Sequence, residues 1–371
     1  MTTFVFPTIA HPTEERVSDK QLTRDRVAAE GNLHEQVAEA PGSPGFGEHV
    51  AMAVRLGLSS RPFHLPAWLF YDAAGSRLFD EITWRPEYYL TRTERGILAA
   101  HADAMIARAS HSNAKTQRMN GAARLRITEL GAGSADKTRL LLKAAVAQQG
   151  TVVYEPVDVS ASALTEAQDR IEREIDGVAV VPRVMDYTHG NGLELEPNAP
   201  GERRLVLYIG SSIGNFDPPD AMRLLRRVRA GLKPGDGLLL GVDLKKDEAT
   251  LLAAYDDAAG VTADFNLNML ARLNRELGAD FYLESFEHRA IWNGRASRIE
   301  MHLASRIAQK VRLAALDLEV EFAEGETIHT ENSYKYRPGQ AESMMAETGF
   351  APAGSWTDEQ GWFGVCLGQV A

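Results

Sequence analysis

A glycine-rich turn carries the first chemical signal in this chain of 371 residues. Leu125 and Ile127 lead into it, Gly131 and Gly133 stand at its centre, and a helical pattern follows. Glycine lets a backbone pass close to a bound ligand, and strand–turn–helix openings of this kind hold nucleotide cofactors. By itself the turn is a weak signal, because any tight loop between a strand and a helix favours glycine.

Polar residues follow four further predicted strands and strengthen that signal. At the strand ends stand Asp158, Asp186, Asn215 and Asp243. The strands alternate with helices, which is typical of a doubly wound α/β domain with a parallel sheet, and ligands bind beyond the carboxyl ends of such strands. One acid at a strand end would be a helix cap, but a glycine turn and four polar residues describe a site. The predicted strands cover residues 152–157, 178–185, 205–209 and 238–242.

The types of these residues favour S-adenosylmethionine over a dinucleotide. Asp136 stands where a dinucleotide turn has its third glycine, and its negative charge lies where pyrophosphate would bind, although Lys137 partly offsets it. S-adenosylmethionine has no phosphate and carries two positive groups. Asp158 can accept from both ribose hydroxyls, Asp186 can accept from the adenine amino group, and Tyr187 can pack on the ring.

The pattern changes after about residue 285, where antiparallel strands replace the alternation of strands and helices. Residues 286–291 and 299–303 flank Asn293-Gly294, a strong hairpin signal, and residues 316–322 and 327–334 predict further strands. We therefore expect an antiparallel insert in the parallel-sheet domain. Residues 1–47 are polar and interrupted by proline and glycine, so we read them as an extension.

Composition limits the partners and the compartment. The formal net charge is −11, which disfavours nucleic acid and anionic membranes as partners. Cys366 is the single cysteine, and neither a signal peptide nor a membrane span is visible. We expect a cytoplasmic monomer. Because His288, His302 and His329 lack a short ligand spacing, we also expect no metal.

Long segments of the chain then indicate a family. Residues 70–83, 86–94, 210–215 and 329–336 are similar to the histidine Nα-methyltransferases of ergothioneine biosynthesis. The similarity runs from about residue 50 to the C-terminus, and strings of this length are far more specific than the glycine turn.

The resemblance implies a class I methyltransferase with a Rossmann-like sheet and a second, α+β domain that binds the substrate. Residues 92–250 and 334–371 would form the cofactor domain, and residues 48–91 and 251–333 the substrate-binding domain. The implied reaction is the transfer of three methyl groups from S-adenosylmethionine to the α-amino nitrogen of L-histidine. Its product is hercynine, and the reaction is the first step of ergothioneine biosynthesis.

The resemblance also implies the site residues. The positions that match cofactor contacts are Gly131, Lys137, Asp158, Asp186 and Tyr187. The positions that match histidine contacts are Tyr88, Asn215, Tyr255, Glu331, Asn332 and Ser333, with Tyr71, Phe79, Thr262 and Met301 as further pocket lining. Because neighbouring residues of an extended segment face opposite ways, we expect little effect from the middle residue, Asn332.

These residue types suit the implied roles. Methyl transfer requires mainly that the protein orient the reactants, and Tyr88, which can hydrogen-bond the amine, is the predicted catalytic residue. Asn215 and Tyr255 can hold the substrate carboxylate, while Glu331 accepts from one imidazole nitrogen and Ser333 contacts the other. Three alternatives stay open: the same fold acting on tryptophan or tyrosine, an NAD-dependent oxidoreductase, and a regulator that only senses S-adenosylmethionine.

Overall fold

The structure is a computed structural model that describes residues 46–111, 123–133, 135–188, 193 and 195–371. Nearly all of the predicted extension, residues 1–47, therefore lies outside the described part of the chain.

An eight-stranded sheet forms the larger part of the fold, in the order β13-β14-β7-β6-β2-β3-β4, with β5 also paired to β3. Strands β2 to β7 run parallel, and β14 is antiparallel to both β7 and β13, which confirms the predicted sheet. The predicted strand at residues 178–185 is instead two short strands, separated at Pro182, which has no N–H for the ladder. The strands are β2 (Arg124–Leu130), β3 (Val152–Asp158), β4 (Val178–Val180), β5 (Arg183–Val184), β6 (Glu202–Tyr208), β7 (Gly237–Asp243), β13 (Phe350–Thr357) and β14 (Phe363–Val370).

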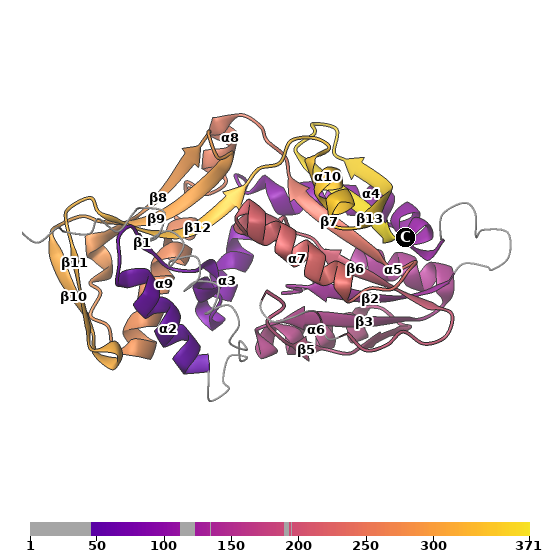
Figure 1. The fold of residues 1–371 in the computed structure, drawn as a ribbon, viewed down its shortest axis with the longest axis horizontal. Helices are drawn as coiled ribbons and strands as arrows, with labels where there is room; N and C mark the ends of the chain where they lie inside the picture. Colours follow the sequence, from indigo (N-terminus) through magenta and orange to yellow (C-terminus); the bar gives the residue numbers. More distant parts are fainter. Residues whose placement is uncertain (1–45, 112–122, 134, 189–192, 194) are drawn as a thin grey trace, which may run out of the picture. The chain divides into compact units, whose positions relative to one another are not determined.

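Helices cover both faces of this sheet (Figure 1). Leu205 and Leu207 of β6 join one buried cluster, and Val206 and Tyr208 join the other, as the period of two in a strand requires. None of the helices in the described residues has the length and apolar content needed to cross a membrane. The first cluster includes α4 (Tyr89–Ser110), α5 (Thr138–Gln149) and α6 (Ala161–Glu174), and the second includes α7 (Pro218–Ala230) and α10 (Gln340–Glu347).

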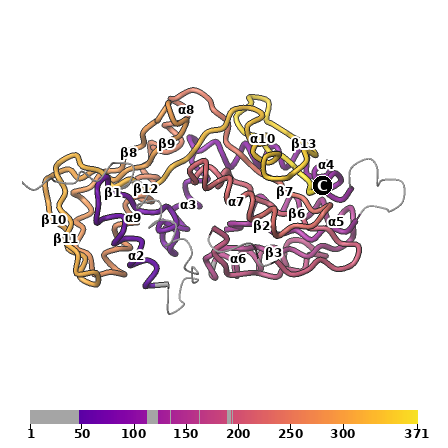
Figure 2. The backbone as a smooth tube through the Cα atoms, viewed as in Figure 1, coloured from indigo at the N-terminus to yellow at the C-terminus, as the bar shows by residue number. Residues whose placement is uncertain are grey.

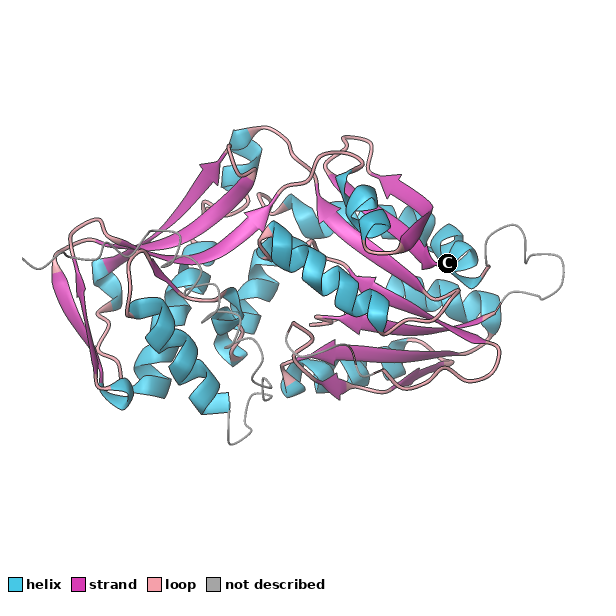
Figure 3. Ribbon diagram, viewed as in Figure 1, coloured by secondary structure: helices cyan, strands magenta, loops and turns pink. Residues whose placement is uncertain are grey.

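A second sheet is built mainly from the insert, in the order β1-β12-β9-β8 (Figure 3). The hairpin is confirmed, but its loop is longer than Asn293-Gly294, because the last pair is Asn293 with Arg298. The side chain of Asn293 accepts from the Ala296 N–H at 3.0 Å and closes this loop. The strands are β1 (Phe63–His64), β8 (Phe286–Asn293), β9 (Arg298–Ser305) and β12 (Thr327–Tyr334), with a separate pair, β10 (Gln309–Leu313) and β11 (Leu318–Phe322).

The segment before the glycine turn packs on this insert, although about 200 residues separate them in sequence (Figure 2). Strand β1 pairs in parallel with β12, and Phe70 stacks on Phe265 at 4.5 Å between ring centroids. One buried cluster contains residues from both segments. The remaining elements are α2 (Phe46–Leu58), α3 (Ala73–Thr83), α8 (Glu248–Ala253), α9 (Val261–Leu277) and the 3-10 turns η1 (Ala67–Phe70), η2 (Ser212–Asn215), η3 (Leu283–Ser285) and η4 (Ala314–Leu316).

Candidate functional site

Asp158, at the end of β3, is bonded to the glycine turn. One carboxylate oxygen accepts from the Gly133 N–H at 3.0 Å, and the other accepts from the Ser160 N–H at 2.9 Å. Burial raises the pKa of Asp158, and these backbone donors oppose the shift. Because a carboxylate offers about four acceptor positions, two bonds to the backbone leave capacity for a ribose diol.

Tyr187 follows β5 and lies against the glycine turn. Gly131 has a φ of +68°, and a Cβ there would lie 2.8 Å from the Tyr187 hydroxyl oxygen, so glycine is needed for both reasons. Asp186 beside it accepts from the N–H and the hydroxyl of Thr188 at 2.7 and 2.5 Å. The predicted adenosine-binding residues are therefore neighbours at one edge of the sheet.

We expect Gly131→Ala to weaken S-adenosylmethionine binding by about tenfold or more, through left-handed strain on the order of 1 kcal/mol and a clash with Tyr187. Titration calorimetry measures the affinity. Gly325→Ala is the matched control, because Gly325 has a φ of +79° but open space around a built Cβ. Equal affinities in the Gly131 variant and the parent would contradict a close approach of ligand to this turn.

Lys137 is paired with a residue that sequence reasoning did not assign. Its ammonium contacts the buried carboxylate of Glu94, which also accepts from the Gly210 N–H at 2.8 Å. Glu94 thus joins the glycine turn to the segment after β6. Its place within the family-like string 86–94 was the available signal, but that string did not indicate a role.

The structure weakens the prediction that the negative charge of Asp136 acts against a bound pyrophosphate. Helix α5 begins at Thr138, so Asp136 precedes the helix, and its carboxylate is paired with Arg95 and Arg139. Because two guanidinium groups balance this charge, Asp136 repels a phosphate less than the sequence alone suggests. The cofactor assignment from the site therefore rests on Asp158, Asp186 and Tyr187.

Four aromatic residues predicted for the substrate pocket form a continuous group. The ring centroids are 5.8 Å apart for Tyr71 and Phe79, 6.3 Å for Phe79 and Tyr88, and 6.4 Å for Tyr88 and Tyr255. Burial, followed by nearby negative charges that include Glu331, raises the pKa of Tyr88 well above its usual value. Tyr88 is therefore a neutral phenol at ordinary pH, able to donate or accept a hydrogen bond but not a ready base.

Glu331 lies on β12, two residues before Ser333, whose hydroxyl contacts Tyr255 of this aromatic group. Burial raises the pKa of its carboxyl to about 7, with Lys335 acting in the opposite direction. Its charge also contributes to the raised pKa values of Tyr71 and Tyr255. Opposite Glu331 in the β9–β12 register lies Met301, which is buried.

Ser333 and Tyr255 lie together rather than at separate ends of a substrate. Their hydroxyl oxygens are 2.7 Å apart, and Lys335 donates to both, at 2.9 and 2.8 Å. Lys335 also contacts Asp243 at 2.8 Å, and Asp243 contacts Lys246 at 2.5 Å. Sequence reasoning placed Asp243 at a strand end but missed both lysines. Lys246 is only three residues after Asp243, whereas the tertiary structure brings Lys335 to that carboxylate.

Asn332 points away from this group. Its amide donates to Asp217 at 3.4 Å, and the Tyr334 hydroxyl donates to the same oxygen at 2.8 Å. The alternation of β12 puts these side chains on the face opposite Ser333. The predicted substrate contact by the Asn332 side chain therefore does not fit this geometry, whereas the expected outward orientation does.

The remaining predicted residues border the site. Asn215 ends η2, which packs against β12: a Cβ on Gly214 would lie 2.9 Å from the Tyr334 carbonyl oxygen. Ser211, before η2, has a φ of +60°, and its hydroxyl accepts from the Asp243 N–H at 2.9 Å. Thr262 is buried in the first turn of α9.

The histidines of the insert have structural contacts. A ring nitrogen of His288 lies 2.8 Å from the Tyr255 carbonyl oxygen, and the rings of His302 and His329 pack with centroids 4.9 Å apart. Within the described ranges, no group of three or more His, Cys, Asp and Glu side chains is arranged to hold a metal ion.

Comparisons with known proteins find a methyltransferase family and several similar proteins. The model of a family described as histidine-specific, SAM-dependent methyltransferases matches residues 50–370. A histidine N-alpha-methyltransferase of Mycolicibacterium smegmatis is 46% identical over 85% of this chain and 92% of its own length. Ergothioneine biosynthesis protein 1 of Neurospora crassa is 29% identical, over 80% of this chain and 32% of its own. An L-tryptophan methyltransferase of Psilocybe serbica is 28% identical over 88% of this chain and 93% of its own.

Proposed function

The chain belongs to the family of histidine-specific methyltransferases that use S-adenosylmethionine, and we propose from this premise that it methylates L-histidine. Three methyl groups pass to the α-amino nitrogen, and the product is hercynine, in the first step of ergothioneine biosynthesis. The observation that carries the choice of substrate is Glu331, an acidic side chain on β12 that lies two residues before Ser333 and opposite the buried Met301.

The residues at the sheet edge fit S-adenosylmethionine. Asp158 offers acceptors for the ribose hydroxyls, Asp186 an acceptor for the adenine amino group, and Tyr187 an aromatic face next to Gly131. Lys137 and Glu94 fix the turn against the segment at Gly210. When bound, the cofactor supplies a methyl group on a sulfonium centre, and the protein supplies the orientation.

The predicted substrate residues contact different parts of the substrate. Glu331 accepts from an imidazole N–H, the neighbouring hydroxyls of Ser333 and Tyr255 contact the other ring nitrogen, and Asn215 holds the carboxylate. In the first two transfers the deprotonated nitrogen still carries a hydrogen, and Tyr88 accepts from it with its neutral hydroxyl, which directs the nitrogen lone pair toward the methyl donor. A proton must leave the amine before each transfer. A site built to hydrogen-bond an imidazole rejects side chains that lack its polar atoms.

We also propose that residues 48–91 and 251–333 form the substrate-binding domain and residues 92–250 and 334–371 the cofactor domain. The buried cluster shared by α2, β1, α9 and the insert sheet supports this division. That the enzyme is a cytoplasmic monomer without nucleic-acid or membrane partners stays a prediction.

Incubation of the purified protein with S-adenosylmethionine and each amino acid in turn tests the function. We expect mass spectrometry to show mono-, di- and trimethylated histidine in succession, with little product from the others. Product from tryptophan or tyrosine alone would favour the nearest alternative, for which the Psilocybe relative provides a precedent. The same assay without turnover, but with cofactor binding by calorimetry, would favour a sensor.

A further inference from the structure

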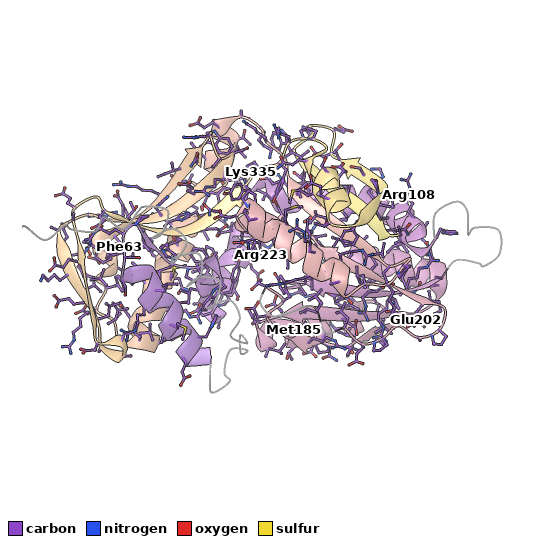
Figure 4. The ribbon with its side chains drawn as sticks, viewed as in Figure 1. Phe63, Arg108, Met185, Glu202, Arg223 and Lys335 are labelled. Carbon is purple, nitrogen blue, oxygen red and sulfur yellow. The ribbon has the colours of Figure 1, made fainter. Side chains whose placement is uncertain are left out.

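Lys335 is a buried cation whose ammonium donates to the hydroxyls of two predicted substrate residues, Tyr255 and Ser333. It directly follows β12 (Figure 4) and precedes Tyr336, which forms a bridge with Leu244, the residue after β7. Its side chain has no exposed surface, as is also true of its ion-pair partner Asp243. A lysine is rarely buried so fully unless all of its donors are used.

The ammonium has one acceptor for each of its three hydrogens. These acceptors are the carboxylate of Asp243 at 2.8 Å, the hydroxyl of Tyr255 at 2.8 Å and the hydroxyl of Ser333 at 2.9 Å. Since lysine is only a donor, both hydroxyl oxygens must accept from it. Neither hydroxyl hydrogen can therefore point toward Lys335.

The two hydroxyls also lie 2.7 Å from each other, so one hydrogen bridges them. The second hydrogen has no place within the triangle of Lys335, Tyr255 and Ser333. If Tyr255 donates to Ser333, the serine hydroxyl points outward, and if Ser333 donates, the phenol does. In either arrangement the Tyr255–Ser333 pair presents one hydrogen-bond donor on the side that faces away from Lys335.

The charge balance lets Lys335 be exchanged without leaving Asp243 unpaired. Lys246 contacts the other Asp243 oxygen at 2.5 Å, and the Tyr89 hydroxyl donates to the carboxylate at 2.7 Å. Removing Lys335 therefore leaves an ion pair in place. Lys246 is the matched control, because its ammonium donates to Asp243, Tyr89 and the Leu244 carbonyl, whereas that of Lys335 donates to Tyr255 and Ser333.

We propose that Lys335 is a positioning residue that forces the Tyr255–Ser333 pair to donate a hydrogen bond to the substrate. The pair then requires an acceptor atom on the ligand, and with histidine, the substrate under the proposed function, this is the ring nitrogen without a proton. Glu331 accepts from the N–H of the other ring nitrogen. Because one group requires a donor and the other an acceptor, Glu331 and the Tyr255–Ser333 pair together select the neutral imidazole over the doubly protonated ring. Lys335 thereby contributes to specificity without touching the substrate.

Steady-state kinetics of Lys335→Met test this role. We expect the KM for histidine to rise by about tenfold or more, as for a lost hydrogen bond in a site with charged groups, with kcat changed far less. The calorimetric affinity for S-adenosylmethionine should stay within about threefold of the parent, a readout that a folding defect would move. Lys246→Met should leave the histidine KM near that of the parent. An unchanged KM in Lys335→Met would overturn the inference.

A double-mutant cycle separates positioning from a general structural effect. In a Ser333→Ala background the lysine has lost one of its hydroxyl partners, so Lys335→Met should add much less to the KM than it does in the parent. Fully additive effects would overturn the inference.

A second substitution covers the case in which Lys335→Met does not bind cofactor. Lys335→Gln retains donors, but its carbonyl can accept a hydroxyl hydrogen, so the outward direction is no longer enforced and the same rise in KM is expected. A parent-like KM in this variant would overturn the inference. Failure of the parent itself to methylate histidine would instead overturn the proposed function.

Discussion

Asp158→Ala is expected to weaken S-adenosylmethionine binding by about 100-fold or more, because two hydrogen bonds to a charged acceptor are lost together, each worth on the order of 1.5 kcal/mol. The same substitution removes the acceptor that holds the Gly133 N–H at 3.0 Å, so the turn loses its anchor to β3. The carboxylate therefore acts twice, on the ligand and on the loop that receives it.

Titration calorimetry with S-adenosylmethionine and with its demethylated product measures this loss. Asp158→Asn separates the two roles, because its amide keeps one acceptor for the turn but presents N–H groups where the ribose hydroxyls would donate. Asp169→Ala, at an exposed position on α6, is the control for removal of an acid from the same region. Parent-like affinity in Asp158→Ala would exclude Asp158 from the cofactor site.

Glu331→Ala is expected to lower kcat/KM for histidine by about 100-fold, while cofactor affinity changes little. The physical reason is that the imidazole N–H would be left without an acceptor in a buried site, and a missing partner there is far more costly than in water. Kinetics with histidine and calorimetry with S-adenosylmethionine give the two numbers. Glu319→Ala, an exposed strand glutamate on β11, is the control. Unchanged histidine kinetics in Glu331→Ala would remove this residue from the site.

The same carboxyl makes stability depend on pH. Burial raises the pKa of Glu331 to about 7 in the folded protein, above the ordinary value that it has when unfolded. Between the unfolded-state pKa and the folded-state pKa, the carboxyl is therefore protonated in the folded protein but ionised in the unfolded chain. Its contribution to the free energy of unfolding is fully present below the unfolded-state pKa and is lost as the pH rises through about 7.

Glu331→Gln should therefore raise the melting temperature, relative to the parent, more at about pH 8 than at about pH 5. Thermal unfolding without ligands at both values checks the sign. The opposite order would mean that the ionised form is stabilised in the folded protein, against the burial of this group.

Much of the fold followed from local patterns. The apolar run 205–209 predicted a strand of the parallel sheet, and β6 sends Leu205 and Leu207 to one side of that sheet and Val206 and Tyr208 to the other. Strand alternation likewise placed Asn332 opposite Ser333. Periodicity depends on backbone geometry alone, and for that reason it can be read from one sequence.

Charges were harder to interpret than periodicity. Asp136 read as a negative charge facing the cofactor, and the structure pairs it with Arg95 and Arg139. Glu94 and Lys335 carried no signal of their own, yet each connects two segments of the site. An ion pair is decided by whichever partner the folded chain brings near, and partners 43 or 92 residues apart leave no spacing to recognise.

The glycine turn, the polar strand ends and the long family-like strings were enough to indicate a methyl donor site and a histidine substrate. These signals are local, because each depends on backbone geometry or on residues close together in the chain. The tertiary structure decided how the site is held and charged: β1 joins β12, Tyr255 meets Ser333, and Lys335 lies behind both. Such contacts form when distant segments bury a common core, so burial and charge balance emerge only in the folded chain.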